Sequence, residues 1–312
     1  MKSVEVINTY KIFTKEFQDC NVEEVVEEIK ENGFFVFKNA ITHEAISKIE
    51  RDATELKLGL NHNEINGVYF EKQYYFTNLL TKSKTFYNFV TSKFVLDVSE
   101  KYLGNTFRLK ALRYYETYGK HQMQWHTDNK TDKSFAHIPG IIFIFYISDV
   151  EDGQFQYIRG SHNWSGEKAY SEYSEEFVNK NFKEKVKNFK LPKGSLIIYN
   201  TYGVHRAKPV QKNNFVRKSV FLQVDSKIDN AEPIIVNTKY IQEINNKISM
   251  FLGFGQPSNY KVFPKTSLNT LPLNKNLIFN IIKYFSYRFI RNIFDLLPKF
   301  LKKIIKRQIK ND

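Results

Sequence analysis

The spacing of apolar residues changes near residue 105, and this change limits the folds that are open to the chain. Upstream, apolar residues recur every three or four positions, which is typical of the buried face of an amphipathic helix. Downstream they alternate, and Ile141–Ile147 forms an uninterrupted apolar run that is typical of a buried strand. Helices followed by many strands predict a mainly β fold with flanking helices, an α+β chain.

Residues typical of helix ends locate the secondary-structure elements upstream of residue 105. Asn21 and Glu24 form a helix N-terminus signature, and Gly33 ends that helix. The strands that follow predict a jelly-roll core at about residues 105–226, inside one domain that spans residues 1–270. Further upstream elements are expected at 34–37 (a strand) and at 43–57 and 83–103 (helices).

The segment Gln124–Asp128 places a histidine and a carboxylate two positions apart. Alternate side chains of a strand project from the same face, so His126 and Asp128 can reach one ion while Thr127 points away. His205 follows a strand-like segment and can bring a second imidazole from a distant strand. Two imidazoles and one carboxylate, with neighbouring coordination positions open, form the facial triad of non-haem Fe(II) sites. The alternative is a surface pair at 126 and 128, with a buried structural imidazole at 205.

Further segments accompany the triad in a fixed order. They are Asp152–His162 (DGQFQYIRGSH), Leu191–Tyr199 (LPKGSLIIY) and Arg217, twelve residues after His205. With Trp125–Asp128 before them, the chain resembles the phytanoyl-CoA dioxygenase family over about residues 30–226. The resemblance implies a double-stranded β-helix (jelly-roll, cupin-like) core. It also implies an iron- and 2-oxoglutarate-dependent dioxygenase, a hydroxylase in which His126, Asp128 and His205 hold Fe(II), with 2-oxoglutarate and O2 as cosubstrates.

The same resemblance assigns a partner to the cosubstrate. Arg217 stands where family members place the arginine that binds the far carboxylate of 2-oxoglutarate, and a guanidinium matches a carboxylate as a planar, bidentate donor. Ser219 projects from the same face of a strand as Arg217, and we expect it to add a hydroxyl. Arg206 is the fallback, although its position next to His205 points it to the other face.

Other functions remain open on these residues. A non-catalytic, membrane-associated binding protein on the same fold would lack turnover, and a metal-dependent hydrolase would need neither O2 nor 2-oxoglutarate. Nucleic acid is not expected as a partner, because related oxidative demethylases carry a second arginine six residues after the first, where this chain has Gln223. His121 and His137 flank the motif. They either contact the metal ligands or the substrate, or they are ordinary loop histidines.

Composition favours a location inside the cell. The single cysteine, Cys20, argues against a disulfide framework. The first residues lack an apolar signal sequence, and no uncharged apolar run approaches the ~20 residues that cross a bilayer. We therefore expect a cytoplasmic protein.

Residues 271–312 are expected to form a separate, basic and amphipathic helical tail. Between Lys275 and Lys310 there are ten lysines or arginines and one acid, which supply +9 of the net charge of +14. Apolar residues recur every three or four positions, and Pro298 is expected to kink the helix or to start a second one. Residues 276–310 therefore suit an anionic membrane surface, to which each basic residue contributes ~1 kcal/mol.

A membrane-bound tail would favour a particular class of substrate. We expect a small or lipid-linked metabolite, such as the sugar of a membrane glycolipid, and an enzyme that is peripheral on the inner face of the membrane. Alternatively, the apolar stripe packs on the barrel or on a second subunit, and the oligomeric state is left open. Residues 167–190 interrupt the strand pattern and are either a lid over the iron or a helix on the surface.

Overall fold

The computed structural model describes most of the chain. The described residues are 12–58, 67–70, 73–76, 79–121, 123–128, 139–164, 173–226, 231–232, 234–241, 245–257, 271–272, 277–298 and 300–302.

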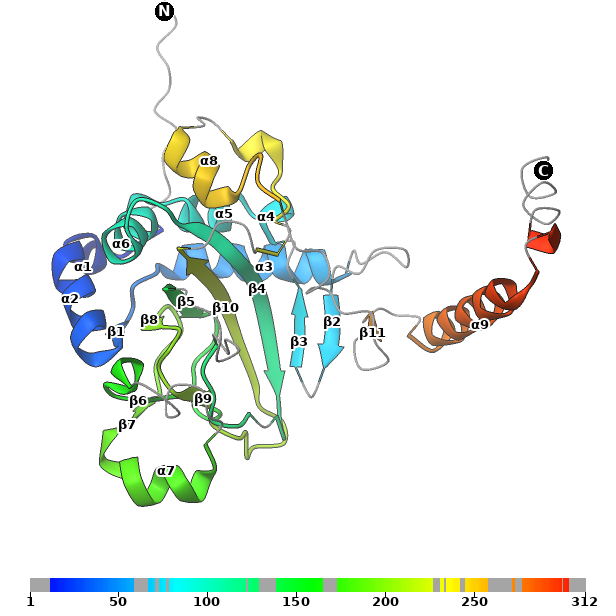
Figure 1. The fold of residues 1–312 in the computed structure, drawn as a ribbon. Helices are drawn as coiled ribbons and strands as arrows, with labels where there is room; N and C mark the ends of the chain where they lie inside the picture. Colours follow the sequence, from blue (N-terminus) through cyan, green and yellow to red (C-terminus); the bar gives the residue numbers. More distant parts are fainter. Residues whose placement is uncertain are drawn as a thin grey trace, which may run out of the picture.

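Two antiparallel sheets face each other across the interior of the molecule (Figure 1). The larger sheet has the strand order β1-β8-β5-β10-β4-β3-β2-β11 and the smaller one the order β7-β6-β9. The strands of the larger sheet are β1 (Phe34–Phe37), β2 (Gly67–Phe70), β3 (Gln73–Phe76), β4 (Arg108–Tyr118), β5 (Gly140–Tyr146), β8 (Leu196–Asn200), β10 (Val216–Asp225) and β11 (Leu271–Pro272). Those of the smaller sheet are β6 (Phe155–Ile158), β7 (Val186–Phe189) and β9 (His205–Ala207).

This arrangement confirms the predicted mainly β fold with flanking helices. The expected strand at 34–37 is β1, which pairs with β8. The larger sheet also takes in β2, β3 and β11, so it extends beyond the predicted core of 105–226. Such short strands gave no alternating pattern long enough to predict them.

The helices cover one face of the larger sheet. Figure 1 places α2–α6 and α8 on that side, and the smaller sheet with α7 on the other. The bounds are α1 (Lys15–Gln18), α2 (Val22–Asn32), α3 (His43–Leu58), α4 (Leu79–Lys82), α5 (Lys84–Val90), α6 (Lys93–Leu103), α7 (Glu175–Phe182), α8 (Asn246–Leu252) and α9 (Leu277–Leu296).

Local capping explains where the first helices begin and end. The Asn21 side chain accepts from the backbone N–H of Glu23 at 2.9 Å, and Gly33 ends α2 with a φ of 89°. The predicted helix at 83–103 is wrong in one respect, because it is two helices. The Ser92 hydroxyl caps the N-terminus of α6, and this cap separates α6 from α5.

The alternation along the strands divides the interior into two cores. On β10, Val220 and Leu222 face the helices, where Phe89 of α5 lies 4.5 Å from the Phe145 ring of β5. Each fully buried phenylalanine contributes about 1.5–3 kcal/mol there. The opposite face of the same sheet packs on the smaller sheet, for example through Tyr199. That face is where the candidate site lies.

The helix α9 extends away from the two sheets (Figure 1). It ends at Leu296, before Pro298, and residues 300–302 are helical again, so Pro298 separates two helical segments. Among the described residues, no helix is both long and apolar enough to span a bilayer. Residues 303–312 of the predicted tail lie outside the described residues, and the domain boundary at 270 stays a prediction.

Candidate metal centre

Two histidines come together at the edge of the smaller sheet. His126 and His205 form an antiparallel bridge, in which each backbone N–H donates to the carbonyl of the other at 3.0 and 2.9 Å. This pairing adds a short fourth segment beside β9. The two imidazole rings lie 4.5 Å apart, so the second histidine does arrive from a distant part of the chain, as predicted.

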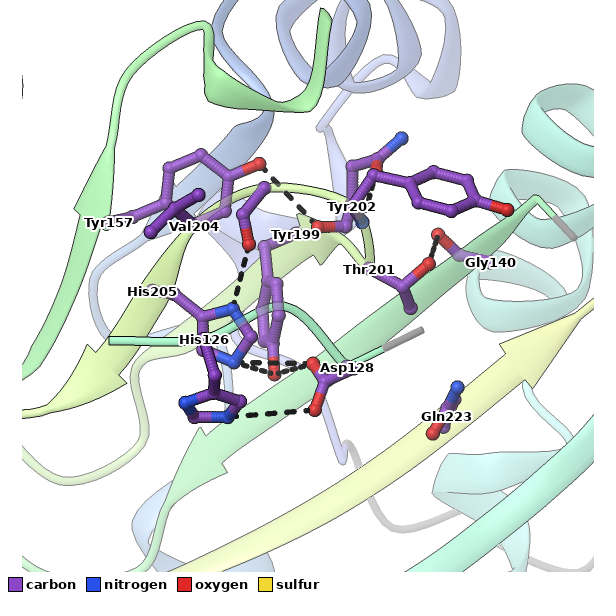
Figure 2. A network of polar contacts seen from close by, with 12 residues as sticks. His126, Asp128, Gly140, Tyr157, Tyr199, Thr201, Tyr202, Val204, His205 and Gln223 are labelled. Carbon is purple, nitrogen blue, oxygen red and sulfur yellow. Dashed lines mark hydrogen bonds and ion pairs between the residues drawn. The ribbon is translucent and has the colours of Figure 1, made fainter. Parts of the chain in front are cut away.

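Asp128 completes the cluster from the loop that follows His126. Its backbone N–H donates to Thr201 O at 3.1 Å, and the Thr201 N–H donates to Gly140 O at 3.1 Å, which ties this loop to the start of β5. The Asp128 carboxylate lies 3.2 Å from His205 Nε2 and 4.0 Å from His126 Nε2 (Figure 2). One ligand atom from each of the three residues falls within 4.8 Å of the others, a set that could hold a metal ion.

The hydrogen bonds of the imidazoles fix which nitrogen is available to a metal. Nδ1 of His126 lies 2.8 Å from Gln124 O, and Nδ1 of His205 lies 2.9 Å from Gly203 O. A carbonyl can only accept, so we assign the proton to Nδ1 in both rings, which leaves the Nε2 lone pairs directed at the cluster.

Burial keeps the second imidazole neutral. Desolvation lowers the pKa of His205 to about 4, although the Asp128 carboxylate acts in the opposite direction. A neutral imidazole is the form that ligates a metal, so His205 needs no deprotonation at physiological pH. Gly203 supports this ring through its carbonyl, and a Cβ at that position would overlap the Tyr157 hydroxyl.

A tyrosine that the sequence analysis did not single out contacts the carboxylate. The Tyr199 hydroxyl donates to Asp128 Oδ2 at 3.0 Å and lies 3.4 Å from His205 Nε2. Burial, followed by the charge of Asp128, raises the pKa of Tyr199 well above its usual value, so the phenol stays protonated as a donor. Partners of this kind orient ligating carboxylates. Alternation along β8, which turns Tyr199 to the inner face, could have indicated it.

The predicted cosubstrate residues lie on the inner face of β10. Arg217 and Ser219 alternate on that strand, opposite Thr117 and Tyr115 of β4, and both are buried. The Arg217 guanidinium donates to Gly153 O and, at 3.3 Å, to Thr117 Oγ1. Its Nε is buried without a hydrogen-bond partner, and the described residues provide it with no ion pair.

Arg217 therefore has the properties of a receptor for an anion. Burial lowers its pKa, which means that the surrounding protein disfavours its charge. Neighbouring His121 is also buried, and its Nδ1 has no hydrogen-bond partner. Burial and the charge of Arg217 lower the pKa of His121 to about 4, so it is a neutral group close to the guanidinium. His137 lies outside the described residues.

The other face of the ligand-bearing segments packs on α7. Arg206 forms an ion pair with Glu175, and its guanidinium lies 4.4 Å above the Trp125 ring. The Trp125 indole also donates to Glu175 at 3.2 Å. Arg206 thus points away from the cluster, as its position next to His205 predicted. Of the segment 167–190, residues 175–182 form α7 and residues 186–189 form β7, which pairs with β6, while residues 167–172 lie outside the described residues.

Comparisons with known proteins agree with the family resemblance seen in the sequence. The pattern of the family described as phytanoyl-CoA dioxygenase (PhyH) matches residues 29–219, and no curated protein matches the chain. A crystal structure of HygX from Streptomyces hygroscopicus, with nickel and 2-oxoglutarate bound, shares the fold at a TM-score of 0.50 and 16% identity, covering 66% of this chain and 87% of that one. The non-haem α-ketoglutarate-dependent carbocyclase SnoK from nogalamycin biosynthesis gives a TM-score of 0.52 and 16% identity over 68% and 86% of the two chains.

The family match spans more than half of the chain and includes the triad and Arg217. The resemblance seen in the sequence and the jelly-roll fold are both confirmed. The chain belongs to the phytanoyl-CoA dioxygenase family.

Proposed function

We propose that the protein is an Fe(II)- and 2-oxoglutarate-dependent dioxygenase that hydroxylates a carbon of a small-molecule substrate and releases succinate and CO2. The observation that carries this proposal is the presence of two kinds of site on the facing surfaces of the two sheets. Three ligand atoms converge within 4.8 Å, and a buried guanidinium lacks an ion pair among the described residues.

In this proposal the residues have separate roles. His126 and His205 hold Fe(II) through Nε2, and Asp128 holds it through its carboxylate, while Tyr199 orients that carboxylate. Iron and cosubstrate, when bound, would supply the oxidising chemistry, and the protein would supply position and electrostatics.

The second site would bind the cosubstrate by its far end. Arg217 offers a planar pair of donors to the distal carboxylate of 2-oxoglutarate, and Ser219 lies on the same face. A carboxylate there would provide the counter-ion that the buried guanidinium lacks among the described residues. This ion pair would fix the orientation of the cosubstrate before O2 enters.

An anaerobic titration tests the assignment. Apoprotein is titrated with Fe(II) and then with 2-oxoglutarate, and the metal-to-ligand charge-transfer absorption of the chelated cosubstrate is followed. We expect the band in the wild type and its loss in His126→Ala. Absence of the band in folded, metal-loaded protein would contradict the proposal.

Admission of O2 then separates the rival activities. Succinate formed in proportion to O2 supports a dioxygenase. Substrate turnover without O2 or 2-oxoglutarate would identify a metal-dependent hydrolase, and metal binding without any turnover would identify a binding protein.

We further propose that the substrate is lipid-linked, with a membrane glycolipid sugar as the specific form, and that the enzyme works at the inner face of a membrane. The exposed apolar residues of α9 support this form, since they would hold the site close to a lipid substrate. Succinate formation with a lipid-linked sugar, compared with the free sugar at equal concentration, tests it. Equal rates would favour a soluble small molecule.

A further inference from the structure

The helix α9 concentrates the exposed apolar surface of the molecule. Twelve large hydrophobic residues are exposed among the described residues, and nine of them lie between Phe279 and Phe300. Phe289 is 67% exposed and Leu296 is 85% exposed. Contiguous apolar surface of this kind marks an interaction site on a soluble domain. The nine residues are Phe279, Ile282, Phe285, Tyr287, Phe289, Ile290, Ile293, Leu296 and Phe300.

Eight of the nine belong to α9, and all of these except Tyr287 lie along one side of the helix. At about 100° per residue, Ile282, Phe289 and Ile293 fall within about 40° of one another. Leu296 and Phe279 extend the same arc at either edge. The opposite arc carries Lys283, Arg288, Arg291 and Asp295 together with Tyr287, and Asn292 lies at its edge, beside Phe285. The sequence interrupts the apolar arc only at Ser286.

The polar arc is basic. Lys283, Arg288 and Arg291 oppose one acid in α9, Asp295, which is 4.0 Å from Arg291. The positive charge continues along the sequence, because residues 275–310 carry ten basic residues and a single acid. A partner for this surface must therefore combine an apolar interior with a negative outer layer.

We propose that α9 binds the surface of an anionic lipid bilayer, lying in the interface with Phe289 and its neighbours inserted among the acyl chains. The basic residues on the opposite arc then reach the anionic headgroups through their long side chains. A second copy of the chain fits this helix less well, because two tails of +9 would be brought together. The bilayer supplies the opposite charge.

Vesicle binding of the full-length apoprotein tests this inference. The probes are vesicles of phosphatidylglycerol with phosphatidylcholine, and of phosphatidylcholine alone, at several salt concentrations. We expect binding to the anionic vesicles, much weaker binding to the neutral ones, and weakening as salt increases. The assay contains no iron, 2-oxoglutarate or O2, so its outcome does not depend on the proposed dioxygenase activity.

A matched pair of variants separates insertion from charge. Phe289→Asp and Asn292→Asp add the same negative charge, and both residues are exposed. Asn292→Asp lowers the net positive charge of the helix by one, which should reduce the partition coefficient onto anionic vesicles roughly fivefold. Phe289→Asp also removes an inserted ring, which adds roughly another tenfold, so the expected loss is roughly fiftyfold.

Three results would overturn the proposal. The first is wild-type protein that does not bind the anionic vesicles. The second is an equal loss in the two variants, which would reduce the contact to non-specific charge. The third is a dimer, detected by light scattering, that Phe289→Asp dissociates and that does not bind vesicles, which would make a second copy the occupant of the face.

Discussion

Replacement of Arg217 by methionine should weaken cosubstrate binding without destabilising the apoprotein. Methionine keeps most of the side-chain length and volume while removing the charge. The guanidinium donates to Gly153 O and Thr117 Oγ1, but its Nε has no hydrogen-bond partner and burial disfavours its charge. The lost hydrogen bonds and the relieved desolvation therefore oppose each other, and we expect the free energy of unfolding to change by less than about 2 kcal/mol.

The effect on the bound state should be much larger. When one member of a buried ion pair is removed, the cost is about 3–5 kcal/mol, because the other charge remains buried without a partner. For the distal carboxylate of 2-oxoglutarate, the lower figure corresponds to a roughly 100-fold increase in Kd. Iron affinity should hardly change, since Arg217 is not among the three residues of the metal cluster.

The anaerobic charge-transfer titration measures this Kd, and denaturant unfolding measures the stability. Arg206→Met is the matched control, because it removes a buried guanidinium that faces the other side and is paired with Glu175. We expect Arg206→Met to lower stability while 2-oxoglutarate affinity stays within severalfold of wild type. A Kd in Arg217→Met equal to that of wild type would refute the reasoning, and a selective rise in Arg206→Met would transfer the role to that residue.

Three further predictions concern the metal cluster and its surroundings. His126→Ala should abolish Fe(II) binding and succinate formation together, and retained Fe(II) affinity in isothermal titration would show that the ligand assignment is wrong. Tyr199→Phe removes the 3.0 Å donor to Asp128 and should weaken Fe(II) binding by roughly tenfold with little change in fold, whereas unchanged affinity would mean that the hydroxyl does not orient the carboxylate. Burial lowers the pKa of His121 and of His205 to about 4, so the unfolded chain binds protons at these imidazoles more readily than the folded chain does. The free energy of unfolding of the apoprotein should therefore be largest above pH 6.5 and fall between pH 6.5 and about 4. His121→Gln should remove at most about 3 kcal/mol of that fall, and an unchanged pH profile would mean that His121 is not held neutral in the folded state.

The triad could be predicted from sequence because its spacing reflects local geometry. The spacing of His126 and Asp128 was interpreted as strand alternation, but only His126 pairs as a strand residue, and Asp128 lies in the loop that follows it. The order of the segments along the chain placed His205 and Arg217 relative to them. The structure brings the three metal-cluster residues together, and it puts Arg217 and Ser219 on one inner face. Their roles in binding iron and cosubstrate stay predictions until the titrations are done.

The partners of these residues were harder to predict because they depend on contacts between distant segments. Tyr199 reaches Asp128 only because β8 pairs with β5 in one particular register, which no local pattern specifies. The packing of α7 behind Trp125 likewise depends on an ion pair between Glu175 and Arg206, which are far apart in the chain. Short strands were missed for a related reason, since their pairing partners rather than their own residues define them.

The backbone bridge between His126 and His205 has a consequence for how the protein would acquire its metal. Two of the three ligands are held by each other's peptide groups, and the third by Thr201, so no segment has to fold around an incoming ion. Zinc fingers, by contrast, obtain much of their folding free energy from the metal. Ferrous iron could therefore leave and return without refolding of the chain. The active fraction of the protein would then depend on the current supply of ferrous iron and not on whether each molecule bound iron while it folded.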